Sequence, residues 1–151
     1  MSAAPRCRGE RRRDTEHRLA HDVDVWVASA SVGGAPYMVP LSFDWEDGTL
    51  LVATPADSPT GRNLAATGAV RLGLGGTRDV SMIEGEVVEV LEIEALARDR
   101  GDRFAARTGF DPRALEAPYR WFRIAPRRIQ AWREANELKG RDLMRDGRWL
   151  G

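Results

Sequence analysis

Residues 36–64, PYMVPLSFDWEDGTLLVATPADSPTGRNL, decide the fold of this chain. In the first part of the stretch every second residue points to the same side, which is the pattern of a β-strand. One face carries Tyr37, Val39, Leu41 and Phe43, and the other carries Met38, Pro40 and Ser42. Asp47-Gly48 predicts a tight turn, because glycine tolerates positive φ and aspartate hydrogen bonds to its own backbone. A second strand over 49–54 is apolar on both faces, as in the middle of a barrel.

The end of this stretch predicts a short helix over 59–67. Ser58 is a favoured N-cap residue, proline is favoured at the first helical position, and Gly68 is a natural helix end. A helix N-terminus that follows a strand presents free N–H groups to an anion. The hydroxyl groups of Ser58 and Thr60 and the charge of Arg62 would add to such a site. The alternative is that Ser58 only caps the helix.

Composition narrows the function classes. A chain of 151 residues is long enough for one domain with a core. Its 23 basic and 23 acidic side chains give no net charge, which argues against nucleic acid or membrane as the main partner. The single cysteine, Cys7, excludes an internal disulfide. No apolar run has membrane-spanning or signal-peptide character, so we expect a cytoplasmic protein.

The rest of the chain predicts a mainly β protein with inserted helices. We expect a disordered, arginine-rich lead segment over 1–14 and a single domain over 15–151. Further strands are expected over 23–31, 69–74, 80–91, 119–124 and 128–133, and helices over 15–21 and 92–108. Gly85 indicates a bulge or a barrel bend, and Asp146-Gly147 a terminal hairpin. Short antiparallel strands with one principal late helix favour a small barrel, and the βαβ rhythm of a dinucleotide-binding fold is missing.

No side chain stands out as catalytic. No serine lies in a Gly-x-Ser-x-Gly turn, and the only histidines, His17 and His21, lie before the first strand, where we interpret them as surface residues and not metal ligands. Arg71 and Arg78 have the chemistry to bind a ligand phosphate through two hydrogen bonds. The alternative for each is an ion pair with a neighbouring carboxylate.

The order of these motifs resembles a known family. A strand with Val-Pro-Leu, an Asp-Gly turn, a strand ending in Ala-Thr, a Ser-x-x-x-x-Asn-Leu loop and a Val-x-Leu strand is similar to the FMN-binding split-barrel family related to pyridoxamine 5′-phosphate oxidase. Pro126, Ile129 and Trp132 are similar to the penultimate strand of that family. The resemblance covers roughly residues 19–133.

The resemblance implies a six-stranded antiparallel split β-barrel that forms a homodimer, with FMN in two clefts at the subunit interface. It implies cofactor contacts from the second strand, the end of the third strand, the following loop and a late residue of the partner subunit. The two arginines of the next hairpin join these candidates on the phosphate-binding chemistry given above. These candidates are Val39, Pro40, Leu41, Ser42, Thr54, Ser58, Thr60, Arg62, Asn63, Arg71, Arg78 and, from the partner subunit, Trp132.

Thr60 stands where the family usually has lysine, which removes a positive charge from the phosphate site. Arg62, Arg71 or Arg78 would then compensate, or the cofactor is a 5-deazaflavin coenzyme, as in some relatives. The expected function is that of an FMN-dependent oxidoreductase acting on an unidentified small molecule. The alternatives are a deazaflavin-dependent reductase and a cofactor-binding dimer without catalysis.

Overall fold

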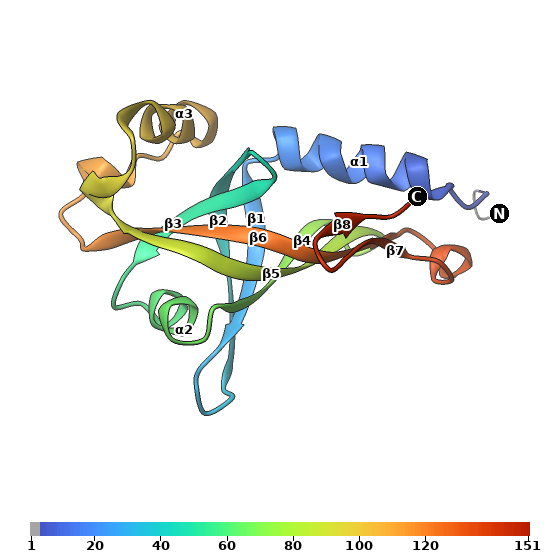
Figure 1. Ribbon diagram of the computed structural model, residues 1–151, viewed down its shortest axis with the longest axis horizontal. Helices are drawn as coiled ribbons and strands as arrows, with labels where there is room; N and C mark the ends of the chain where they lie inside the picture. Colours follow the sequence, from blue (N-terminus) through green and yellow to red (C-terminus); the bar gives the residue numbers. More distant parts are fainter. Residues whose placement is uncertain (1–3) are drawn as a thin grey trace.

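The computed structural model describes residues 4–151 and has the expected mainly β architecture (Figure 1). Its strands form one antiparallel sheet in the order β3-β2-β1-β4-β5-β6-β7-β8, and an additional pairing of β3 with β6 closes the first six into a barrel. The strands are β1 (Asp24–Ala30), β2 (Pro36–Glu46), β3 (Thr49–Pro55), β4 (Ala69–Gly76), β5 (Asp79–Glu92), β6 (Tyr119–Trp132), β7 (Asp142–Arg145) and β8 (Arg148–Trp149).

Three α-helices surround the barrel (Figure 1). They are α1 (Arg8–His21), α2 (Pro59–Thr67) and α3 (Arg98–Thr108), with short 3-10 turns at Ile93–Ala95, Pro112–Ala114 and Ala135–Glu137. The expected short helix after β3 is confirmed in full as α2, which ends at Gly68 with φ of 67°. Within residues 4–151, no helix is both long and apolar enough to span a membrane.

The hairpin of β2 and β3 confirms the interpretation of the opening stretch. Asp47 and Gly48 both have positive φ, as a tight turn between two twisted strands requires. β3 is buried on both faces because it separates two hydrophobic clusters. Leu50 and Val52 face the barrel core, whereas Leu51 packs in a second cluster beneath α3. The second cluster consists of Leu51, Ala53, Leu96, Phe104 and Trp121.

One expectation about the late strands is wrong. The segments 119–124 and 128–133 are not separate strands but parts of the single strand β6, which continues through Pro126. The register shifts between Glu84 and Gly85 of β5, so that Gly85 lies opposite Pro126 and Arg127 bulges out of the ladder. The bulge absorbs the proline, which has no N–H group to donate to the neighbouring strand. The ladder is therefore irregular at Gly85, as expected, but the extra residue lies on β6 and not on β5.

The lead segment also differs from its expectation. Residues 1–3 lie outside the described residues, but residues 4–14 are ordered, and α1 begins at Arg8. Arg6 and Arg11 are buried, because the rest of the protein supplies their acceptors. Glu137 accepts from Arg6, and the carbonyl groups of Ala131 and Glu137 accept from Arg11. In this part of the chain the structure therefore has a helix and buried arginines where composition predicts disorder.

Candidate functional site

The loop between β3 and α2 is held by a chain of hydroxyl groups. Ser58 Oγ donates to the Pro55 carbonyl at 2.7 Å and accepts from the Gly61 N–H at 3.0 Å. Thr54 Oγ1 lies 3.2 Å from Ser58 Oγ. Ser58 is therefore an N-cap residue, as in the simpler of the two sequence interpretations. The cap and an anion site at the same helix end are compatible, because the Thr60 N–H group still lacks an intrahelical acceptor.

Thr60 is the unusual member of this loop. It is 1% exposed, and its Oγ1 has no hydrogen-bond partner among the described residues, which is costly for a buried hydroxyl group. Gly61 beside it has no space for a side chain, since a Cβ there would collide with the Pro55 carbonyl oxygen. Arg62 is exposed, and its Nη1 donates to the Asp57 carbonyl. The loop thus carries an unsatisfied hydroxyl group and an exposed cation within three residues.

β2 provides an open backbone edge next to this loop. Residues 36–42 pair with β1 on one side, but β3 pairs with β2 only over residues 43–46. The four predicted residues Val39–Ser42 lie in the open part. Pro40 is exposed opposite Trp26, and Ser42 Oγ donates to Asp24 at 2.9 Å. An unpaired strand edge offers N–H and C=O groups to a ligand.

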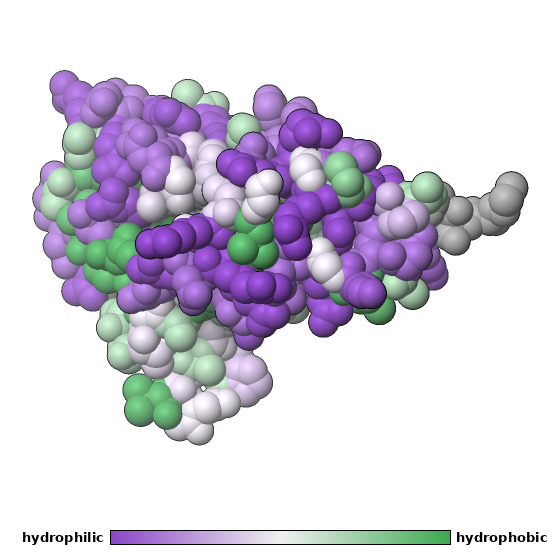
Figure 2. All heavy atoms as spheres, turned by 45° about the vertical axis from the view of Figure 1, so that its right-hand side comes forward, coloured by the Kyte–Doolittle hydropathy of each residue, from purple (hydrophilic) through white to green (hydrophobic). Residues whose placement is uncertain are grey.

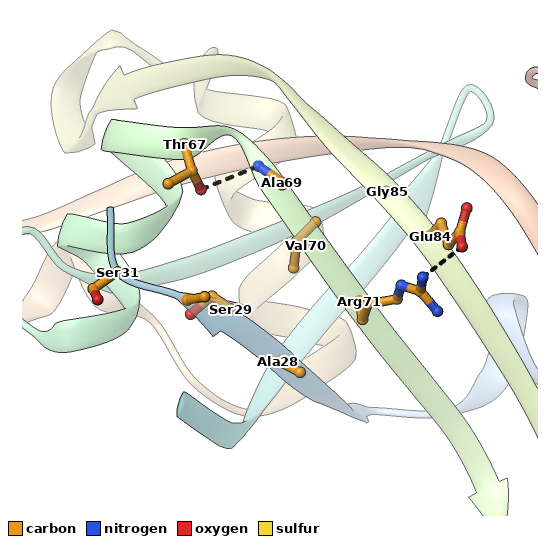
Figure 3. Close-up of a pocket in the computed structure, with 10 residues that line it drawn as sticks. Ala28, Ser29, Ser31, Thr67, Ala69, Val70, Arg71, Glu84 and Gly85 are labelled. Carbon is orange, nitrogen blue, oxygen red and sulfur yellow. Dashed lines mark hydrogen bonds and ion pairs between the residues drawn. The ribbon is translucent and has the colours of Figure 1, made fainter. Parts of the chain in front are cut away.

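A groove runs along the outer side of the barrel from the end of β1 over β4 to β5 (Figure 3). Its volume is about 550 Å³, within the range of small-molecule sites. Arg71 and Glu84 project over it and form an ion pair of 2.6 Å. Ser29, from β1, accepts a hydrogen bond from Asn63 Nδ2 at 3.1 Å, which connects the groove with α2.

A second hollow of about 430 Å³ continues the groove along the same face. Ala28 and Arg71 line both. Its apolar lining includes the exposed side chains of Trp26, Met38 and Met82. Trp26 and Met82 lie on either side of Gly73 in adjacent strands, so the floor between them is free of side-chain atoms. The result is a shallow apolar hollow at the side of the barrel.

The structure brings some of the predicted residues together and separates others. Thr54, Ser58, Thr60, Arg62 and Asn63 lie at or near the start of α2. Arg71 lies in the groove, where its ion pair with Glu84 matches the alternative interpretation. Arg78 is exposed in the turn between β4 and β5, and Trp132 lies at the end of β6 opposite Val80, with the Arg141 guanidinium over its ring.

Sequence reasoning did not single out several groove residues. The position of Glu84 could have been predicted from the Gly75-Gly76 turn, because the register of that hairpin places Glu84 opposite Arg71. The contact of Ser29 with Asn63 joins residues 34 positions apart, and no local pattern indicates it. No group of three or more potential metal ligands exists among the described residues.

The six strands close into a barrel, but β3 leaves residues 36–42 of β2 unpaired, so the barrel is split along β2. This architecture makes the chain a split-barrel protein. The family model described as pyridoxamine 5′-phosphate oxidase matches residues 17–133. The chain therefore belongs to the pyridoxamine 5′-phosphate oxidase family. No curated protein matches the sequence.

Solved structures share the fold at low sequence identity. An F420 reductase is 17% identical and has a TM-score of 0.64, with 76% of this chain and 94% of that chain covered. A FAD-binding protein from Mesorhizobium loti is 20% identical with a TM-score of 0.62, covering 80% and 90%. General Stress Protein 26 from Bacillus anthracis is 20% identical with a TM-score of 0.54, covering 77% and 88%. At these identities, the likeness establishes the fold.

Proposed function

We propose that this chain binds FMN and acts as a flavin-dependent oxidoreductase on a small molecule. Family membership supports the class of protein, and the open edge of β2 beside the α2 loop is the observation that carries the cofactor site. An isoalloxazine ring needs donors and acceptors at its pyrimidine side, and a ribityl phosphate needs hydroxyl groups, N–H groups and a cation. The open edge of β2, the unpaired hydroxyl and N–H groups of Thr60 and the exposed Arg62 are groups of these kinds, so the residues present fit the cofactor.

Each part of the site has a distinct role in this proposal. The backbone of Val39–Ser42 would hydrogen bond with the ring, while Thr54, Ser58 and Thr60 would lie near the phosphate. Arg62 would supply the charge that lysine gives in the family, because its exposed side chain is held only by the Asp57 carbonyl. Bound FMN supplies the hydride and electron transfer, and the protein supplies binding and orientation.

A second copy of the chain would complete the site. The outer face of β1, β2 and β5 exposes 49% of Trp26, 61% of Met38 and 43% of Met82, and neighbouring exposed apolar side chains of this kind are typical of interaction surfaces. Figure 2 shows a largely hydrophilic surface from which the hairpin of β1 and β2 projects with pale and green residues. Val32, at the tip of this hairpin, is 82% exposed. We propose that the partner subunit covers these residues and that the partner's Trp132 reaches the cofactor.

A deazaflavin coenzyme is the alternative cofactor. The uncharged Thr60 at the usual lysine position and the likeness to an F420 reductase favour it. The visible spectrum of the purified protein, followed by titration with FMN and with the deazaflavin coenzyme, separates the two. A colourless protein that takes up neither compound would contradict both proposals and leave a dimer without a cofactor.

The phosphate site has its own test. FMN and riboflavin are titrated into the wild type, Arg62→Ala and Ser58→Ala while flavin fluorescence is recorded. Loss of a hydrogen bond to a charged group weakens binding by about 1.5–3 kcal/mol. We expect this loss for FMN and little change for riboflavin, which lacks the phosphate. Arg98→Ala, an exposed arginine on α3, is the matched control.

If both variants bind FMN as tightly as the wild type does, the phosphate does not bind at the start of α2. Arg71→Ala and Arg78→Ala are then the next variants to titrate. A monomer in light scattering, at concentrations where FMN binds, would contradict the shared cleft.

A further inference from the structure

The hairpin that joins β4 to β5 is bound by side chains of α1. Arg18 Nη2 lies 3.0 Å from Asp79 Oδ1, and Arg18 Nη1 donates to Ser81 Oγ at 3.1 Å. Thr15 Oγ1 lies 2.7 Å from the same Ser81 oxygen, and both of these hydroxyl residues are fully buried. One face of α1 is therefore hydrogen bonded to the first residues of β5.

A second cation fixes the same carboxylate. Arg6 is 7% exposed, and its Nη2 lies 3.4 Å from Asp79 Oδ1 and 2.8 Å from Glu137 Oε1. Its Nη1 lies 2.8 Å from Asp14 Oδ2. Asp79 is thus shared by two arginines, and one of them is held by the buried carboxylate of Glu137. We refer to Arg6, Arg18 and Asp79 as the Asp79 cluster.

Gly75 shows how closely α1 approaches the hairpin. A Cβ at this position would lie 2.8 Å from Arg18 Nη1, and it would also collide with the carbonyl oxygen of Asp79. The φ of Gly75 is +83°, which side chains disfavour. Only glycine allows the guanidinium group to lie against the end of β4 while the chain turns there.

The hairpin is a wall of the apolar hollow beside the groove. Gly75, Gly76, Thr77 and Val80 line this hollow together with Trp26 and Met82 across the sheet. Residues 75–78 are exposed. Because the turn itself contributes little buried surface, the contacts at its base largely determine where the wall stands.

We infer that the Asp79 cluster positions this wall of the groove, so that a helix outside the barrel controls the shape of the apolar hollow. Arg6 and Arg18 act through Asp79 and line neither part of the groove, which makes them positioning residues. The consequence for association of two copies rests on the proposed function, because there the apolar face is the subunit interface. The effect on the hairpin itself does not depend on that proposal.

Hydrogen exchange of the full chain tests the inference. In Arg18→Gln we expect the amides of residues 76–80 to exchange about tenfold faster or more, since a charged hydrogen bond at the base of the hairpin is lost. The amides of residues 122–124, in the centre of β6, should keep their rates. The control is Arg12→Gln on the same helix, whose arginine pairs with Glu16 at 2.8 Å. Neither region should change in the control.

A general loss of stability would raise the exchange rates of both regions together, and that result would overturn the inference. Unchanged rates at 76–80 would also overturn it. Asp79→Asn is a second variant, since it removes the charge that Arg6 and Arg18 share and keeps the size of the side chain, and we expect the same local increase in exchange. The dissociation constant of the dimer, measured by sedimentation, should rise in both variants. If the wild type is a monomer, the dimer proposal fails while the exchange result still decides the role of the cluster.

Discussion

Glu137 is the best position at which to test the energetics of this fold, because it is 1% exposed and faces a buried arginine. Its carboxylate accepts from the Arg6 backbone N–H at 2.7 Å, from Arg6 Nε at 3.1 Å, from Arg6 Nη2 at 2.8 Å and from the Arg133 N–H at 2.8 Å. The hydrogen bonds with the Arg6 side chain, opposed by burial, lower the pKa of Glu137 from 4.5 to about 2.

The perturbation is Glu137→Gln. A pKa difference between 4.5 and about 2 corresponds to about 3 kcal/mol of folding free energy at neutral pH. Removal of one partner of a buried ion pair typically costs about 3–5 kcal/mol. We expect the lower end of this range, because Asp14 and Asp79 still offset part of the Arg6 charge in the variant. Both routes lead to a loss of about 3 kcal/mol in the free energy of unfolding at pH 7.

The pH dependence follows from the sign of the shift. Because the pKa is lower in the folded state, the contribution is fully present above the unfolded pKa of 4.5 and is lost as the pH falls towards 2. Urea unfolding, followed by tryptophan fluorescence, should therefore show a difference between wild type and variant that shrinks to about half or less at pH 3. Glu134→Gln, an exposed neighbour, is the control. A variant within about 0.5 kcal/mol of the wild type at pH 7 would refute the reasoning, and so would a difference that does not change with pH.

Three further substitutions test the barrel and the loop. Gly85→Ala should lower the free energy of unfolding by about 1–3 kcal/mol, because the new Cβ would lie 2.5 Å from Ile124 Cγ2 in the core. Gly76→Ala, where nothing lies within 4 Å, is its control, and equal stabilities would contradict the tight packing at the bulge. Ser58→Ala should lower the unfolding free energy by about 1 kcal/mol through loss of the N-cap, measured in urea, and an unchanged midpoint would show that water replaces the hydroxyl group. Phe104→Ala should cost about 3–5 kcal/mol in thermal or urea unfolding, whereas a loss below about 1 kcal/mol would mean that the second cluster contributes little to global stability.

Local patterns in the sequence predict most of the barrel. The alternation over 37–43 and the Asp47-Gly48 turn predict the hairpin of β2 and β3, and the Ser58-Pro59 start predicts α2 to the residue. These features follow from propensities and turn chemistry that act within a few residues. The irregularity at Gly85 is predictable for the same reason.

Features that depend on distant partners are not predictable in this way. Arg6 is part of a polar, arginine-rich segment whose composition indicates solvent, yet its main acceptor is Glu137, 131 positions later. β6 continues through Pro126 only because the bulged Arg127 and the facing Gly85 accommodate it. In the candidate site, Ser58 and Thr54 follow from the loop sequence, but the open edge of β2 depends on where β3 ceases to pair with it.

The burial of Arg6 has a consequence for how this chain should be divided. The match to the family model spans residues 17–133, and a shortened chain with those limits would lose Arg6, Arg11, Thr15 and Glu137 together. Ser81 would then lose its hydrogen bond with Thr15 and keep the one from Arg18, and the carbonyl of Ala131 would lose the hydrogen bond from Arg11. The contacts that satisfy the buried polar groups of the barrel therefore extend beyond the residues that define the family, on both sides of the match.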